Sequence, residues 1–118
     1  MTREIRIGWT LMLCLSCLPA LGGDTSGEIQ YLLDSIGQSN CSFIRNGAVH
    51  GAAEAESHLR MKYTRGKSRI STADQFIEHV ASKSSWTGNP YYIDCPDAER
   101  QPAGGWLTDR LTSYREKL

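Results

Sequence analysis

Residues 41–47 read Cys-Ser-Phe-Ile-Arg-Asn-Gly, and this segment decides the fold. A short run of β-favouring residues ends there at Asn46-Gly47, a strong turn dipeptide. A second run, Tyr-Tyr-Ile-Asp-Cys at 91–95, stops at Pro96. We predict that the two runs are strands that pair antiparallel. Cys41 and Cys95 can then lie at neighbouring positions, with the Cβ separation of about 4 Å that a disulfide needs.

Cysteine usage supports this pairing. Cys14 and Cys17 belong to an N-terminal leader, so only Cys41 and Cys95 remain in the mature chain. Their bridge closes a loop of roughly 55 residues, which destabilises the unfolded state by about 4 kcal/mol. Two unpaired buried thiols and a redox pair are the alternatives, and the lack of a C-x-x-C spacing argues against the redox pair.

The leader, residues 1–22, has the form of a signal peptide. Arg3 and Arg6 precede the apolar run 9–18, and Pro19 and small residues follow it. The run has ten residues, half of the roughly 20 that cross a bilayer, which disfavours an uncleaved membrane anchor. We therefore predict export to the periplasm.

The small residues Ala20 and Gly22 place the cleavage between Gly22 and Gly23. The mature protein is then a single domain, 23–118. A lipoprotein acylated at Cys17 is disfavoured, because Cys14 stands where an aliphatic residue is expected, and an extracellular location is also less favoured than the periplasm.

The mature chain is nearly neutral, with 11 basic and 12 acidic residues. A general nucleic-acid binder needs a net basic surface, so we expect no nucleic-acid partner.

Four helices are predicted from the spacing of apolar residues. The first covers 25–37 with a capping box at Thr25 and Glu28, and the second covers 48–65. The third opens at a capping box of Thr72 and Gln75. After a flexible connection at 97–105, the last helix has an inner face of Leu107, Leu111, Tyr114 and Leu118. The predicted fold class is α+β, mostly helical, with about four helices packed on a two-stranded antiparallel β-hairpin.

Several linked motifs carry a family resemblance. In order they are Cys41-x-Phe43-Ile44-Arg45-Asn46-Gly47, Ala55-x-x-His58-Leu59-x-x-Lys62, Ile70-x-Thr72-Ala73-x-x-Phe76-Ile77, Ala81-Ser82-x-Ser84-Ser85-x-Thr87-Gly88-x-Pro90-Tyr91, Cys95-Pro96 and Trp106-Leu107. The set resembles the YfeK-like family of small exported bacterial proteins, a domain of unknown function. The resemblance implies a Gram-negative cell envelope location and a shared fold, and no established activity or ligand.

His50, Glu54 and His58 are spaced four apart on the predicted second helix. His50 and His58 would lie roughly 12 Å apart along its axis, too far to share one metal ion. A solvated or hydrogen-bonded helix face explains them better, and we predict no metal and no cofactor.

A basic run follows at Arg60, Lys62, Arg65, Lys67 and Arg69. It can attract an anionic partner, or it can offset the negative end of a helix dipole and solvate the next loop.

Hydroxyl residues gather at Ser82, Ser84, Ser85 and Thr87, one turn after His79. Without a G-x-S-x-G elbow or an orienting carboxylate, helix capping and turn formation explain them better than a serine nucleophile does. Arg45 with Asn46 can hold a carboxylate, although turn chemistry already accounts for Asn46-Gly47.

We predict a non-enzymatic envelope protein that binds a partner through the segments 45–62 and 84–91. The partner is an envelope protein or an anionic envelope component. The candidate binding residues are Arg45, Asn46, His58, Arg60, Lys62, Ser84, Ser85 and Tyr91. The alternative is a small envelope hydrolase or metal-dependent enzyme that uses His50, Glu54 and His58, or Ser84 and Ser85.

Overall fold

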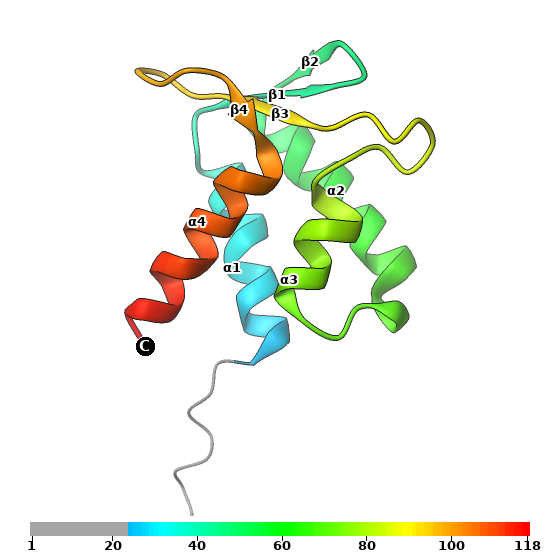
Figure 1. Cartoon of the computed structure of the whole chain (residues 1–118), viewed down its shortest axis with the longest axis vertical. Helices are drawn as coiled ribbons and strands as arrows, with labels where there is room; N and C mark the ends of the chain where they lie inside the picture. Colours follow the sequence, from blue (N-terminus) through cyan, green and yellow to red (C-terminus); the bar gives the residue numbers. More distant parts are fainter. Residues whose placement is uncertain (1–23) are drawn as a thin grey trace, which may run out of the picture.

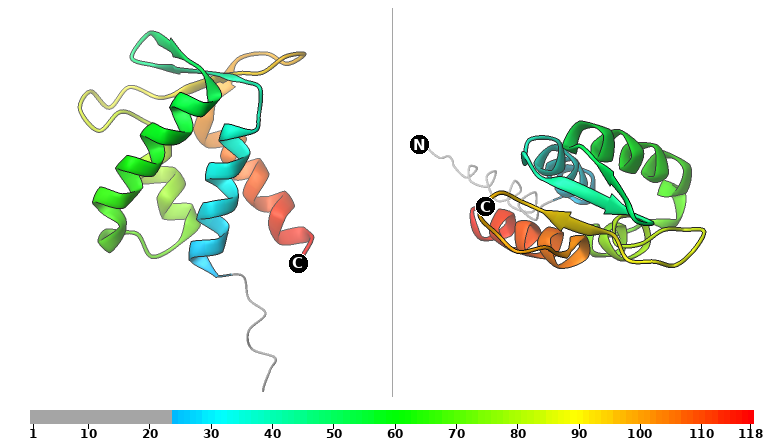
Figure 2. Two further views of the ribbon diagram at one scale, coloured as in Figure 1. Left: turned by 180° about the vertical axis from the view of Figure 1, so that it is seen from behind. Right: turned by 90° about the horizontal axis from the view of Figure 1, so that it is seen from above.

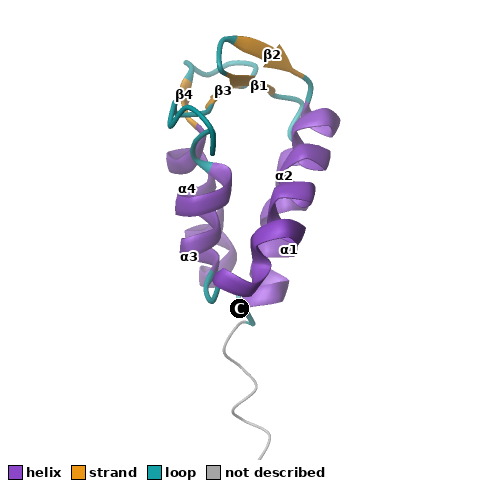
Figure 3. Ribbon diagram, turned by 90° about the vertical axis from the view of Figure 1, so that its right-hand side faces the viewer, coloured by secondary structure: helices purple, strands orange, loops and turns teal. Residues whose placement is uncertain are grey.

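The computed structural model describes residues 24–118, so the predicted leader and its cleavage site lie outside the described residues. Four helical segments stand side by side beneath a small sheet (Figure 1; Figure 3). Seen from above, the strands lie across the ends of the helices (Figure 2). The elements in order are α1 (Thr25–Gly37), β1 (Ser42–Arg45), β2 (Ala48–His50), α2 (Ala52–Gly66), η2 (Lys67–Arg69), α3 (Ala73–Phe76), η3 (Ile77–Ala81), β3 (Tyr92–Asp94), β4 (Gln101–Pro102) and α4 (Ala103–Glu116).

The fold class is α+β, as predicted, and the predicted antiparallel pairing of β1 with β3 is confirmed, with Phe43 opposite Ile93. The sheet is larger than predicted. It has four strands in the order β2-β1-β3-β4, each pair antiparallel. The expectation of a two-stranded sheet is therefore wrong.

Both missed strands are short edge strands. The segment 48–50 was expected to begin the second helix, but it forms β2, and Val49 in its middle is 66% exposed. The segment 101–102 was expected to be flexible, but it pairs with β3. Strands of two or three residues have too little alternation to be recognised, and their hydrogen bonds come from a neighbour distant in sequence.

The turn and the disulfide of the opening segment are confirmed. Asn46 and Gly47 both have positive φ angles, 50° and 81°, as a two-residue type I′ hairpin turn requires. Cys41 and Cys95 are bonded, with Cα atoms 4.2 Å apart, one step beyond the paired residues Ser42 and Asp94.

The predicted capping boxes differ in detail from the structure. Asp24, not Thr25, caps α1, because its Oδ1 accepts a hydrogen bond of 2.7 Å from the Gly27 amide. Thr72 caps α3 as predicted, accepting from the Gln75 amide at 3.0 Å. The Gln75 side chain then accepts from the Ser71 amide rather than completing the box at Thr72.

Helix α1 lies in the middle of the bundle and contacts α2, α3 and α4 (Figure 1). Its predicted apolar stripe is fully buried, and α4 buries Leu107 and Leu111 against it. Leu118 was assigned to the inner face of the last helix but lies beyond the end of α4, and it is 67% exposed. The stripe on α1 consists of Ile29, Leu32, Leu33 and Ile36.

Two arginines connect the helices through ion pairs. Arg115 of α4 donates to both carboxylate oxygens of the buried Glu28 on α1, at 2.8 and 3.0 Å, and also contacts Asp74 of α3. Arg60 of α2 lies 2.8 Å from Asp34 on α1. Glu28, predicted to cap its own helix, instead joins α1 to α4.

The described helices are all too short or too polar to qualify as membrane-crossing segments.

Candidate functional site

Two adjoining cavities open between the sheet, α2 and the loop that precedes β3. We call them the apolar pocket, of about 310 Å³, and the basic pocket, of about 620 Å³. Four residues line both and form their common wall: Arg45, His58, Met61 and Tyr91. The segments around 45–62 and 84–91, far apart in the sequence, therefore meet at one site.

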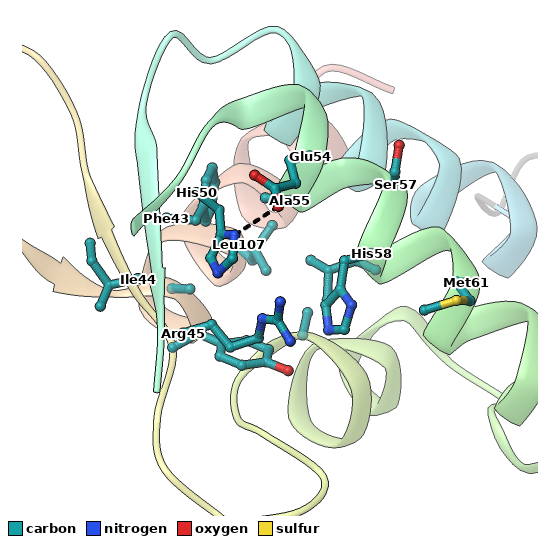
Figure 4. Close-up of a pocket in the computed structure, with 14 residues that line it drawn as sticks. Phe43, Ile44, Arg45, His50, Glu54, Ala55, Ser57, His58, Met61 and Leu107 are labelled. Atoms are coloured by element: carbon teal, nitrogen blue, oxygen red, sulfur yellow. Dashed lines mark ion pairs between the residues drawn. The ribbon is translucent and has the colours of Figure 1, made fainter. Parts of the chain in front are cut away.

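The apolar pocket lies between the β1–β2 hairpin and α2 (Figure 4). Its walls come mainly from buried apolar side chains, with Phe43 from β1, Leu59 from α2 and Leu107 from α4. Leu107 was predicted to lie on the inner face of the last helix, and it is fully buried. The cavity lies beside these core side chains, between the β1–β2 hairpin and α2. No pattern in the sequence indicates that a cavity forms there.

His50 and Glu54 stand together at the edge of the apolar pocket. His50 Nδ1 lies 3.0 Å from Glu54 Oε2 (Figure 4). The prediction placed His50 on the same helix as Glu54 and His58, but it lies on β2. The contact arises because Gly51 turns the chain from β2 directly into α2. Across residues 24–118, no three histidine, cysteine or acidic side chains gather closely enough to hold a metal ion.

The basic pocket is lined by cationic side chains, and no aspartate or glutamate lines it. The cations come from β1, α2 and η2, together with two histidines. They are Arg45, Lys62, Arg65 and Arg69, with His58 and His79.

The three arginines of the basic pocket are not engaged elsewhere. Within residues 24–118, Arg45, Arg65 and Arg69 contact no carboxylate. Arg60, Arg100 and Arg115 each do, at 2.7 Å in the closest pair of Arg60 and 2.8 Å in those of Arg100 and Arg115. Guanidinium groups without a carboxylate partner retain all their donors for an anion.

Arg45 and His58 point toward one another across the pocket (Figure 4). Burial lowers the pKa of His58, and the charges of Arg45, Lys62, His50 and Arg65 lower it further. The protonated imidazole is therefore disfavoured, because a proton added there meets several positive charges.

Lys62 and Tyr91 are hydrogen-bonded to one another in the wall of the basic pocket. The Lys62 ammonium donates to Tyr91 Oη at 3.0 Å and to the carbonyl oxygens of Val80 and Lys83 at 2.8 and 3.1 Å. These carbonyls lie at and just beyond the end of η3, so Lys62 satisfies groups that a helix end leaves unpaired. Burial and the neighbouring Arg45 lower the pKa of Lys62 to about 8, and burial raises the pKa of Tyr91.

The loop 82–90 is held in place by Ser84 and Asn46. Ser84 is buried, and its Oγ accepts from the Trp86 and Thr87 amides and from Asn46 Nδ2, at 3.3 to 3.4 Å. Asn46 Oδ1 accepts from Thr87 Oγ1 at 2.8 Å. Both candidate residues thus fasten the loop to the hairpin turn, and in residues 24–118 no histidine is hydrogen-bonded to Ser84.

The other predicted residues divide between the pocket and the bundle. Ser85 is exposed and lines the basic pocket, whereas Arg60 faces α1 and is fully engaged there. Sequence reasoning missed two residues that line the basic pocket, Met61 and Trp86. Trp86 is 96% exposed. The sequence did contain a signal for the pocket residues that α2 contributes. His58, Met61, Lys62 and Arg65 stand at i, i+3, i+4 and i+7 and so share one helix face.

Comparison with known proteins places the chain next to proteins of unknown function. A family described as a family of unknown function (DUF5329) matches residues 23–115. The curated relative "Uncharacterized protein YfeK" from Salmonella typhimurium is 42% identical over 82 residues, which cover 69% of this chain and 68% of the relative. No solved structure matches the chain.

Proposed function

Since this chain belongs to the DUF5329 family, whose function is unknown, we propose its role from its own side chains: it is an exported, non-enzymatic protein that binds an anionic group in the basic pocket. Family membership confirms the resemblance to YfeK-like proteins that the motifs indicated.

The observation that carries the proposal is the set of unpartnered cations in one concavity. Arg45, Arg65 and Arg69 line a cavity of about 620 Å³ with no acidic side chain in its wall. Like charges held close together raise the free energy of the empty site, and an anion with several acceptor oxygens offsets this repulsion. The same repulsion contributes to the lowered pKa values of His58 and Lys62.

The shape and the overall charge favour a small anionic group over a nucleic acid. The mature chain has 11 basic and 12 acidic residues, so the positive charge is local to the pocket. A duplex requires an extended basic surface that neutralises several phosphates in a row.

The periplasm, reached by export, is the location that fits this role. The disulfide between Cys41 and Cys95 is typical of proteins that fold in oxidising compartments. The leader at 1–22 has the composition of a signal peptide. A binding protein in the envelope meets anionic metabolites and anionic wall and membrane components.

The arrangement of the polar groups supports binding without catalysis. His50 and Glu54 line the apolar pocket and not the basic pocket, where Ser84 lies. His58 lines both pockets, but the Oγ of Ser84 is used by the loop. A serine nucleophile needs a base hydrogen-bonded to it and a third group that orients the base. His50 is paired with Glu54, and within residues 24–118 no serine hydroxyl, Ser57 of the same pocket included, is hydrogen-bonded to either of them.

The test is an NMR titration of the mature, disulfide-bonded protein with inorganic phosphate at constant ionic strength. We expect saturable shifts of the amides around Arg45, His58 and Arg65. Replacing one pocket guanidinium in Arg65→Gln should weaken phosphate binding about fivefold, equivalent to ~1 kcal/mol.

Arg110→Gln is the matched control, because Arg110 packs on the Trp106 ring outside the basic pocket. It should leave the phosphate affinity unchanged. Equal losses in both variants, or shifts spread evenly over the surface, would reduce the site to general charge attraction and refute the proposal.

A further inference from the structure

We propose that the ligand is a small amphiphilic organic acid, whose anionic group lies against Arg45 and His58 and whose apolar part fills the apolar pocket. This inference rests on the proposed anion-binding function and names the class of ligand that the site takes.

The two pockets are parts of one site because they share a wall. Arg45, His58, Met61 and Tyr91 each line both cavities. A group bound at the Arg45 guanidinium therefore lies where the apolar and basic surfaces meet. An ion without an apolar part would use only one of the two surfaces.

The polar groups of the apolar pocket leave one charge without a partner. His50 and Glu54 satisfy one another at 3.0 Å, and His58 has a lowered pKa. Within the described residues, Arg45 is then the charged side chain of this pocket that has no carboxylate partner. A carboxylate or phosphate would compensate it, whereas a neutral apolar molecule would leave a guanidinium facing an apolar surface.

Tyr91 adds a neutral donor at the shared wall. Its oxygen accepts from Lys62, and within residues 24–118 its own O–H donates to no other group. Burial keeps the phenol protonated by raising its pKa. An anion at the shared wall can therefore accept from the guanidinium and from the phenol together.

The size of the apolar pocket limits the ligand. Its volume of about 310 Å³ lies at the lower end of small-molecule sites, which range from about 300 to 1,000 Å³. This space fits a short chain or a single ring, and it excludes the paired acyl chains of a membrane lipid. A free small acid is therefore favoured over a lipid in a bilayer.

The test is calorimetry with straight-chain carboxylates from acetate to octanoate, with octanol as the neutral analogue. Affinity should rise by up to about fourfold for each added methylene until the pocket is full. Octanol should bind far more weakly than octanoate. Inorganic phosphate should compete with octanoate, because both use the shared wall.

Two variants separate the parts of the site. Arg45→Gln should weaken the whole carboxylate series by a similar factor, because it removes the anion contact. Ala55→Leu narrows the apolar pocket and should abolish the dependence on chain length while phosphate still binds. If Ala55→Leu fails to fold, nuclear Overhauser contacts between the octanoate methyl group and Phe43 or Leu107 provide the same information in the wild-type protein.

The outcomes distinguish this inference from the function on which it rests. If acetate, octanoate and phosphate bind equally tightly and all depend on Arg45, the anion site stands and the amphiphilic ligand is refuted. If no anion binds, the proposed function fails and takes the inference with it, whereas octanol binding as tightly as octanoate while phosphate still binds refutes the amphiphilic acid alone. Stronger binding to vesicles containing phosphatidylglycerol than to octanoate would replace the small acid with a membrane surface.

Discussion

The bundle and the pocket use arginine in opposite ways. In the bundle, Arg60 and Arg115 each contact carboxylates on other helices and so fix the packing of the helices. In the pocket, Arg45 and Arg65 face a cavity with no acidic side chain in its wall. The difference shows that an arginine's role follows from the partners that the fold brings to it, because the residue type is the same in both regions.

The basic run on α2 contains both kinds of arginine. Arg60 and Arg65 are five residues apart, which turns them about 140° from one another around a helix with 3.6 residues per turn. Arg60 consequently faces α1, while Arg65 shares the pocket face with His58 and Lys62. The run was interpreted as one surface, and the helix geometry divides it into two.

The largest expected effect on stability comes from the disulfide that joins the start of β1 to the end of β3. The double variant Cys41→Ser/Cys95→Ser should lower the free energy of unfolding by about 4 kcal/mol, because the loop between the cysteines becomes free in the unfolded chain. Urea denaturation measures this loss. The reduced wild-type protein should lose the same amount of unfolding free energy as the double variant. An unchanged urea midpoint after reduction would contradict the stabilising role of the disulfide.

The next effect tests the bundle side of the comparison. Arg115→Met should lower the free energy of unfolding by about 2 kcal/mol, because the buried carboxylate of Glu28 loses both hydrogen bonds from the guanidinium. Arg110→Met is the matched control on the same helix, since Arg110 contacts an aromatic ring rather than a buried acid. Similar losses in the two variants would show that the Glu28 pair adds no stability.

A smaller effect on stability is expected when two arginines of α2 are compared directly. Arg60→Gln should destabilise the protein by about 1 kcal/mol, because Asp34 and Glu56 lose a shared partner. Arg65→Gln should change stability by no more than about 0.5 kcal/mol, since it breaks no ion pair within the described residues. Thermal unfolding under identical conditions gives both values, and the reverse order would remove the distinction between bundle and pocket arginines.

The smallest effect is the pH dependence that the pocket imposes through His58. Its pKa in the folded protein is lowered from 6.5 by burial and by Arg45, Lys62, His50 and Arg65, so the folded state resists protonation while the unfolded state accepts it. Its contribution to stability is therefore complete above pH 6.5 and decreases as the pH falls toward the folded pKa. The stability difference between wild type and His58→Gln should shrink over this range.

His79→Gln is the control, because His79 is an exposed histidine at the same pocket. A bound anion should raise the pKa of His58 and reduce the pH effect, which an NMR titration of the imidazole with and without octanoate can follow. An equal pH dependence for the two histidine variants would show that the pocket charges do not act on His58.

Much of the fold could be predicted because it depends on local rules. The apolar stripe of α1, the Asn46-Gly47 turn and the pairing of Cys41 with Cys95 each follow from residue spacing or from turn chemistry. The edge strands β2 and β4 could not be predicted, because two or three residues carry no periodic signal and extend only when a neighbouring strand pairs with them.

The site was predicted only in part. Arg45, His58, Lys62, Ser85 and Tyr91 were proposed as binding residues, and they line the basic pocket. Ser84 was also proposed and lines this pocket, although its Oγ is hydrogen-bonded within the loop and to Asn46. Asn46 and Arg60 do not line the pocket, because each is hydrogen-bonded to a distant part of the chain. The apolar pocket was not predicted, because an empty volume between core side chains leaves no pattern in the sequence.

The sequence alone determined where the helices form, apart from the start of the second, and the hairpin turn, because these depend on residues close together. The Cys41–Cys95 pairing was also predicted from the sequence. The tertiary structure alone decided which cations are neutralised and which face a cavity. Glu28 and Arg115 meet across 87 positions, and Arg45 meets the face of α2 only when the sheet closes over the bundle. Electrostatic partners and cavities depend on distances in space, which local sequence rules do not specify.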